Sequence, residues 1–423
     1  MLIEVIQRGE TLYEIARRYG VTVDSIVSAN ELPDPNTLVV GQAIVIPTRG
    51  RFHTVQRGES LWQIARRYGT SVEAISRVNQ IQNPAQIQTG TRLIIPRGTR
   101  PQIETNGYLT QISAEGAQKV RDTGENLTYI SPFSYHVLSN GSLQPINDGA
   151  VLNAAKAENV SPLMVITNFS QGFSSELAHT ILSNPTLQNE VLTNVLRIMR
   201  EKGYTGLNID FEYVFPRDRQ NYNNFLRRAV DRLHPEGYTV STALAPKYST
   251  GQSGLLYEAH DYAFHGRTAD FVVLMTYEWG WAGGAPRAIS PITEMRKVLN
   301  YAVREIPRDK IMMGVSTYGR DWRLPFVAGV TRARTISEQQ AVDLAREHNV
   351  DILYDWTAHA PHFRYRDSQG REHEVWYEDA RSIEAKYELV RSYRLRGLSY
   401  WVLDSRLPQS WLLLQDDFQI KKL

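Results

Sequence analysis

The segment from Gly206 to Val214, GLNIDFEYV, contains the residues best suited to chemistry. Apolar side chains alternate there with Asn208, Asp210 and Glu212, the pattern of a β-strand whose two faces differ. On such a strand Asp210 and Glu212 point the same way, roughly 6.6 Å apart along the chain. One carboxyl group can protonate a leaving oxygen, and two like charges so close together raise the pKa of one of them. The segment therefore predicts an acid–base site, and the alternative is an edge strand with a solvated polar face.

The elements around this segment predict an α/β barrel. Apolar strand-like segments recur at helix-sized intervals, at residues 107–111, 127–134, 163–168, 206–211, 239–245, 271–277, 311–317 and 397–403. Eight strands with intervening helices predict a TIM (β/α)8 barrel over residues 103–423. A doubly wound sheet is the alternative, but no glycine-rich phosphate loop follows a strand. The long gap between the seventh and eighth strands predicts a small α+β insertion, about residues 321–379.

Other candidate residues follow the predicted strands at the end of a barrel where active sites form. They are aromatic, acidic or soft apolar side chains, with few cations, and we expect Met275, Tyr277, Glu278, Tyr318 and Trp401, together with Asn208, to contact substrate. Aromatic faces stack on sugar rings and carboxylates perform acid–base catalysis. The composition of the barrel mouth favours a carbohydrate over a phosphate ligand.

The first hundred residues are a duplication. Gln7-Arg8-Gly9-Glu10 recurs 49 positions later as Gln56-Arg57-Gly58-Glu59, with no insertion between the copies. Each copy predicts a strand, two helices and a closing strand. We expect the units at residues 1–48 and 51–97, with a polar Gly- and Pro-containing linker at 97–101.

The composition excludes several classes of protein and of binding site. The 423 residues are 42% hydrophobic and 22% charged, which is typical of globular proteins, and the net charge of +2 gives no signal for nucleic acid. The absence of cysteine excludes disulfides and cysteine-bound zinc. We expect no Sec-type signal peptide, because a basic segment followed by an apolar one is missing at the start, and no membrane span. The oligomeric state stays open.

The duplicated units resemble the LysM module along their whole length, most clearly in VQRGESLWQIARRYGTSVEAISRVN followed by LIIP. The resemblance implies binding of glycans that contain N-acetylglucosamine, such as peptidoglycan and chitin, in a shallow groove between two loops. The alternative is that the residues at these positions serve only to form turns and to cap helices. The expected groove residues are Gly9, Glu10, Thr11, Leu12 and Asn30 in the first unit, and Gly58, Glu59, Ser60, Leu61, Asn79 and Ile81 in the second.

The second half resembles glycoside hydrolase family 18, the chitinase-like barrels. The family pattern DxxDxDxE falls on Thr205, Asn208, Asp210 and Glu212, so the last two acidic positions are kept. The resemblance implies that Glu212 is the general acid/base. It implies that Asp210 orients the 2-acetamido group of the sugar, whose own oxygen attacks the anomeric carbon.

Further motifs extend this resemblance. MTYEW is similar to the sixth-strand motif, in which Tyr277 would hydrogen-bond the acetamido carbonyl, and GLSYWVLD places Trp401 beneath the sugar. GVSTYGRDW and ALAPK match the seventh and fifth strands. Asn208 and Glu278 stand where the family has Asp, and VITNF replaces the third-strand SxGG, which favours a different glycan. Family members need no metal, and we expect no cofactor.

Two LysM units before such a barrel resemble the spore cortex-lytic N-acetylglucosaminidases of spore-forming bacteria. This resemblance implies a retaining hydrolase of peptidoglycan located at the coat–cortex boundary of the spore and reaching it without an export signal. Two alternatives stay open. One is a non-catalytic peptidoglycan-binding coat protein with a lectin-like barrel, and the other is a chitinase.

Overall fold

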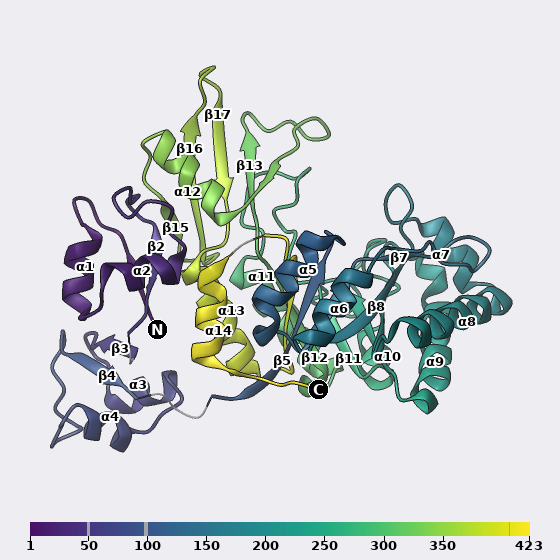
Figure 1. Ribbon diagram of the computed structural model, residues 1–423, viewed down its shortest axis with the longest axis horizontal. Coiled ribbons are helices and arrows are strands. Elements are labelled where there is room, and N and C mark those ends of the chain that lie inside the picture. Colours follow the sequence, from purple (N-terminus) through teal and green to yellow (C-terminus); the bar gives the residue numbers. More distant parts are fainter. Residues whose placement is uncertain (49–50, 97–99, 406) are drawn as a thin grey trace.

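The computed structural model describes residues 1–48, 51–96, 100–405 and 407–423, with Arg51 described by its backbone alone. Part of the predicted linker, residues 97–99, lies outside these ranges, as does the predicted end of the second unit at 97. Figure 1 shows two small N-terminal units beside a large barrel that carries an additional sheet. No helix in the described ranges is long and apolar enough to cross a lipid bilayer.

The barrel is closed by eight parallel strands, as the sequence predicts. Neighbouring strands pair in chain order, and the last strand pairs with the first, Gly397 facing Glu104. The strands are β5 (Gln102–Leu109), β6 (Tyr129–Pro132), β8 (Ser161–Thr167), β9 (Gly206–Asp210), β10 (Thr239–Leu244), β11 (Phe271–Leu274), β12 (Ile311–Ser316) and β18 (Gly397–Trp401).

The outward faces of these strands pack against a ring of helices. Leu207, Ile209 and Phe211 belong to the main hydrophobic core, and the Phe211 ring stacks on Tyr222 and Phe225 of the following helix. The helices of the barrel are α5 (Ala114–Thr123), α6 (Gly149–Ala157), α7 (Ser175–Leu182), α8 (Pro185–Lys202), α9 (Arg219–Leu233), α10 (Tyr262–Thr268), α11 (Ile292–Glu305), α13 (Ala380–Tyr393) and α14 (Pro408–Asp417). Two short strands, β7 (Tyr135–His136) and β19 (Gln419–Ile420), extend the sheet.

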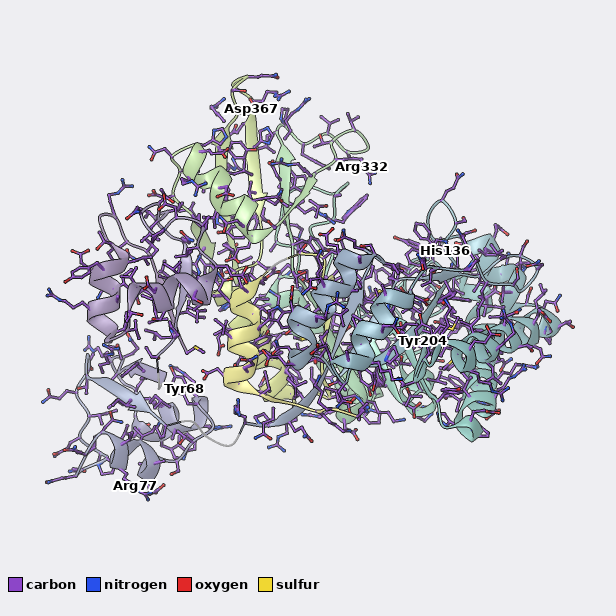
Figure 2. All side chains as sticks on the ribbon, in the orientation of Figure 1. Tyr68, Arg77, His136, Tyr204, Arg332 and Asp367 are labelled. Carbon is purple, nitrogen blue, oxygen red and sulfur yellow. The ribbon has the colours of Figure 1, made fainter. Side chains whose placement is uncertain are left out.

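The predicted insertion between the seventh and eighth barrel strands forms a separate antiparallel sheet with one helix. Its elements are β13 (Gly319–Arg323), β14 (Arg334–Ile336), α12 (Glu338–Glu347), β15 (Leu353–Asp355), β16 (Ala360–Arg366) and β17 (Glu372–Trp376). In Figure 2, Asp367 and Arg332 mark two outer loops of this insertion. Because β13 begins directly after the seventh strand, the insertion starts at the barrel mouth.

Each N-terminal unit has the predicted strand, two helices and closing strand. The first contains β1 (Leu2–Val5), α1 (Leu12–Tyr19), α2 (Val23–Asn30) and β2 (Ala43–Ile46), and the second contains β3 (Arg51–Thr54), α3 (Leu61–Arg67), α4 (Val72–Val78) and β4 (Arg92–Ile95). The side chains of Thr11 and Ser60 cap α1 and α3. The two small cores are the same in kind, with Ile15 and Ile64 fully buried.

The two units differ in how they meet the rest of the chain. Ala43 and Val45 of β2 join the core of the barrel, and the amide of Ile352 in the insertion donates to the Val40 carbonyl at 2.8 Å. Gly41 allows this approach, because a β-carbon there would lie 1.9 Å from the Ile352 carbonyl oxygen. In Figure 1 the first unit lies beside α13 and α14.

The outward face of the second unit is exposed instead. Ile94, which corresponds to Val45, is 38% exposed. Arg92, which corresponds to Ala43, reaches the first unit, where its guanidinium lies 4.6 Å from the centre of the Tyr19 ring. In Figure 2, Tyr68 lies on the side of the second unit that faces the first unit, and Arg77 lies at the opposite, lower edge.

Candidate active site

Asp210 and Glu212 lie in a pocket at the mouth of the barrel. The pocket has a volume of about 610 Å³, and its wall also contains Met275, Tyr277, Glu278 and Trp401. The alternation predicted that Glu212 lies on the strand with Asp210. Strand β9 instead ends at Asp210, and Glu212 lies in the loop beyond it. The structure therefore brings six of the eight predicted barrel residues together around one cavity.

Hydrogen bonds from neighbouring side chains to the backbone fix the position of Glu212 in its loop. The buried side-chain amide of Asn168 accepts from the Glu212 amide at 2.9 Å and donates to the Glu212 carbonyl at 2.8 Å. His260 accepts from the Ala245 amide through Nδ1, so its Nε2 carries the hydrogen and donates to the Phe211 carbonyl at 3.0 Å. Burial lowers the pKa of His260 to about 4, which keeps the ring neutral. Two neutral side chains thus hold the backbone on both sides of the Phe211–Glu212 bond.

Asp210 is a buried acid with an unsatisfied oxygen. Its side chain is 4% exposed, and its Oδ1 has no hydrogen-bond partner among the described residues. Burial raises the pKa of Asp210 to about 7. A buried polar atom without a partner is rare and costly, so this oxygen is available to a ligand.

Glu212 is the second acid of the pair. Burial, followed by the charges of Asp210 and Glu278, raises the pKa of Glu212 well above its ordinary value. Two buried carboxyl groups this close titrate as a pair, and the pair keeps a proton near neutral pH. The arrangement can donate a proton to a leaving oxygen.

Aromatic rings form the apolar wall of the pocket. The Trp401 ring, at the end of β18, stacks nearly parallel to Tyr277 with centroids 6.3 Å apart and meets the edge of Phe133 at 4.9 Å. Burial, then the neighbouring Tyr108 and Asp210, raises the pKa of Tyr277, so its phenol stays a hydrogen-bond donor. The rings offer an apolar face beside a polar donor, as sugar binding requires.

Glu278, in the wall of the same pocket, takes part in an ion pair. Arg320 donates to Glu278 at 2.7 Å, and the Tyr318 hydroxyl donates to the same oxygen. Tyr318 itself is 4% exposed and does not line the pocket. Its position supports Glu278 and does not support the direct substrate contact that we predicted for Tyr318.

Asn208 also lies behind the pocket wall. It accepts from the Tyr108 hydroxyl and donates to the Ser241 hydroxyl, each at 2.9 Å, and it is 1% exposed. With its amide engaged on both sides, Asn208 forms a neutral layer beneath Asp210. The predicted contact between Asn208 and substrate is not supported by this placement.

Several residues in the wall of the pocket were not predicted from the sequence. They come from loops whose path the strand pattern does not predict, and they are Phe173, Tyr213, Leu256, Tyr257 and Trp281. The exposure of Trp281, 51%, is unusual for so large an aromatic side chain. A tryptophan in a glycine-rich loop, WGWAGG, is the one signal that could have found it.

The predicted groove residues of the N-terminal units have structural partners. The Asn30 amide donates to the carbonyls of Ile26 and Val45 and accepts from the Val45 amide, and Asn79 makes the same three bonds. Leu12 and Leu61 are buried in their cores. Beside them two large aromatic side chains are exposed, Tyr13 at 68% and its counterpart Trp62 at 61%.

Family models match most of the chain. The model for glycosyl hydrolases family 18 matches residues 104–405, and the model for the LysM domain matches residues 5–47 and 53–96. The chain is 51% identical to the cortical fragment-lytic enzyme of Bacillus subtilis (strain 168), over 100% of this chain and 99% of the relative.

Solved structures agree with these matches. The spore cortex-lytic enzyme SleL of Bacillus cereus is similar with a TM-score of 0.92 and 42% identity, over 100% of this chain and 98% of the other. SleL of Bacillus megaterium QM B1551 gives a TM-score of 0.89 and 41% identity, over 100% and 99%. Both the barrel and the N-terminal units are therefore shared, and the chain belongs to glycoside hydrolase family 18 and carries two LysM domains.

Proposed function

We propose that this protein hydrolyses spore cortex peptidoglycan, cleaving the β-1,4 bond on the reducing side of N-acetylglucosamine. The observation that carries the proposal is the buried acid pair Asp210 and Glu212, which opens into the pocket walled by Tyr277 and Trp401. The relatives named cortical fragment-lytic enzymes support cortex fragments as the substrate. We place its action at the coat–cortex boundary of the spore during germination.

In the proposed mechanism Glu212 protonates the leaving glycosidic oxygen. No second protein group is needed as nucleophile, because the acetamido oxygen of the bound sugar attacks its own anomeric carbon. Asp210 accepts a hydrogen bond from the acetamido N–H. It also stabilises the positive charge that develops on the ring that forms when the acetamido oxygen bonds to the anomeric carbon. After departure of the leaving sugar, Glu212 takes a proton from a water molecule. The water oxygen bonds to the anomeric carbon as the bond from that carbon to the acetamido oxygen breaks, which regenerates the acetamido group with retention of configuration.

Tyr277 and Trp401 position the reacting sugar. The Tyr277 hydroxyl donates to the acetamido carbonyl, and the parallel Trp401 ring supports the apolar face of the sugar. Met275 and Glu278 complete the wall, and Arg320 holds the Glu278 carboxylate in place. These contacts favour an N-acetylated sugar, because an unsubstituted hydroxyl would leave Asp210 and Tyr277 without partners.

The LysM domains are proposed to hold the polymer near the barrel. Gly9–Leu12 with Asn30, and Gly58–Leu61 with Asn79 and Ile81, would form the loops of two glycan grooves. Since the asparagine side chains are engaged in each domain, backbone groups of these loops and the exposed Tyr13 and Trp62 would meet the sugar. Two linked sites raise residence on a polymer through effective concentration.

Mass spectrometry of the products tests the proposal. Purified cortex fragments are digested, the reducing ends are converted to alditols, and the terminal sugar is identified. We expect N-acetylglucosaminitol at every new end, and no products from Glu212→Gln. Products that end only in muramic residues would refute the bond assignment, and equal products from Glu212→Gln would refute the acid.

A further inference from the structure

A second pocket adjoins the catalytic one. It has a volume of about 550 Å³ and shares Pro246, Tyr257 and Trp279 with the catalytic pocket, so the two spaces meet at these side chains. The rest of its wall is polar or aromatic and comes from the loop after β10 and from the region leading into α11. These residues are Tyr248, Ser249, Gly251, Gln252, Ser253, Arg287 and Glu294.

The wall of this pocket is rich in hydrogen-bond donors. The Arg287 side chain is 48% exposed, and the nearest carboxylate oxygen, on Glu294, is 3.9 Å from its guanidinium. Within the ranges that the structure covers, the guanidinium of Arg287 makes no hydrogen bond. The Glu294 carboxylate forms an ion pair with Lys297 at 3.1 Å. The Gln252 side-chain oxygen accepts from the Tyr248 amide at 2.8 Å, which leaves the NH₂ group of Gln252 for a ligand. Such a wall suits an acceptor, and above all a carboxylate.

The chemistry of peptidoglycan places a carboxylate close to the bond that is cleaved. A muramic residue is linked through its 4-oxygen and carries a lactyl group on the adjacent 3-oxygen. When the bond to that 4-oxygen is cleaved, the lactyl group lies next to the scissile oxygen and therefore next to the general acid. Chitin has a hydroxyl at the same position, and a muramic lactam has lost the carboxylate.

We propose that the second pocket binds the carboxylate of the lactyl or peptidyl substituent on the muramic residue that leaves, with Arg287 as its charged partner. The inference rests on the proposed function, since it assigns the leaving sugar of that reaction. Exposed Tyr248 provides a face for the substituent or the sugar that carries it. The pocket thereby distinguishes muramic residues with a free carboxylate from lactams and from chitin.

Arg287→Gln tests this proposal, with Arg296→Gln as the matched control. Arg296 is an exposed arginine on α11, the helix that follows Arg287, and it does not line the pocket. Three purified substrates are compared: fragments with carboxylate-bearing muramic residues, fragments with only lactam, and chito-oligosaccharides. We expect Arg287→Gln to raise KM about 3- to 10-fold on the first substrate alone with kcat retained, as for loss of one partly exposed ion pair.

Binding measurements separate failure of this proposal from failure of the proposed function. Calorimetry with the carboxylate-bearing fragment compares Glu212→Gln with the double variant that also carries Arg287→Gln, so the result does not depend on cleavage. We expect the double variant to bind about 3- to 10-fold more weakly. Equal affinity, or an equal loss on lactam and chito-oligosaccharide, overturns the pocket assignment. Wild-type protein that releases no N-acetylglucosamine reducing ends overturns the proposed function instead.

Discussion

The barrel mouth and the LysM loops both resemble glycan-binding regions, but their polar side chains are used differently. At the mouth, the Oδ1 atom of Asp210 is buried without a partner among the described residues. In the LysM domains, Asn30 and Asn79, at the ends of α2 and α4, each make three hydrogen bonds within their own domain. A fold tolerates an unsatisfied buried group at a cost in stability, so such a group indicates a ligand, whereas a satisfied one indicates structure. The comparison predicts that mutations at the mouth affect rate and mutations in the loops affect stability.

The largest expected effect is at the mouth. Glu212→Gln keeps the shape of the side chain but cannot donate a proton, so kcat on cortex fragments should fall by about 10²- to 10⁴-fold. Thermal unfolding should be unchanged or occur at a slightly higher temperature, because a buried acid is replaced by a neutral group. A variant with normal kcat, or one that is unfolded, would contradict a catalytic role for this side chain.

Two asparagines provide a matched pair. Asn30→Ala leaves the Val45 amide and carbonyl without partners, and we expect a loss of about 1–3 kcal/mol in unfolding free energy with kcat retained on short fragments. Asn168→Ala releases the backbone of Glu212, so kcat should fall about 10-fold or more while KM changes little. Denaturant unfolding and steady-state kinetics of both variants provide the check. Equal effects of the two variants on kcat would contradict the distinction.

The pH dependence should have opposite signs in the two regions. The raised pKa of Asp210, about 7, means that the folded barrel holds a proton the unfolded chain has released, so its contribution to stability is lost as pH rises from about 4 to 7. Burial would raise the pKa of Glu59, but the Gln56 amide and His53 hold it below its ordinary value. Its contribution is therefore lost as pH falls below about 4.

Unfolding measured against pH checks both signs. Asp210→Asn should remove the decrease between about pH 4 and 7, and Glu59→Gln should weaken the loss at acid pH. The cleavage rate should also fall at alkaline pH, as the acid pair loses its last proton. An Asp210→Asn variant whose stability still declines over that interval would show that another group causes it.

The smallest effect should come from the exposed ring of the second LysM domain. Trp62→Ala removes an aromatic face without disturbing the core, so the Kd for long glycan strands should rise about 3- to 10-fold. Unfolding should be unchanged, and so should kcat on short fragments. Sedimentation with insoluble cortex measures the binding, and unchanged retention would exclude this ring as a contact.

Much of the architecture could be predicted because it depends on local patterns. The eight strands follow from apolar segments at regular intervals, and the two N-terminal domains follow from a repeat of 49 residues. The end of β9 at Asp210 could not be predicted in this way, because Phe211 continues the alternation while the hydrogen bonds of Asn168 hold Glu212 out of the strand.

The remaining differences arise from tertiary contacts. Asn208 and Tyr318 have the residue types of a sugar site, but Ser241 and Glu278 engage them behind the wall. The docking of the first LysM domain left a readable signal, since Ala43 and Val45 stand where the second domain has Arg92 and Ile94. An outward strand face that is small and apolar in one copy and charged in the other indicates which copy is covered.

In the proposed reaction the sugar's own acetamido group is the nucleophile, assisted by Asp210 and Glu212. The most direct measurement is kcat on a series of short glycan fragments that differ only in fluorination of the N-acetyl group at the cleaved sugar. Fluorine withdraws electrons from the acetamido oxygen, so kcat should fall steeply from N-acetyl to N-trifluoroacetyl. A kcat that does not change along the series would contradict it.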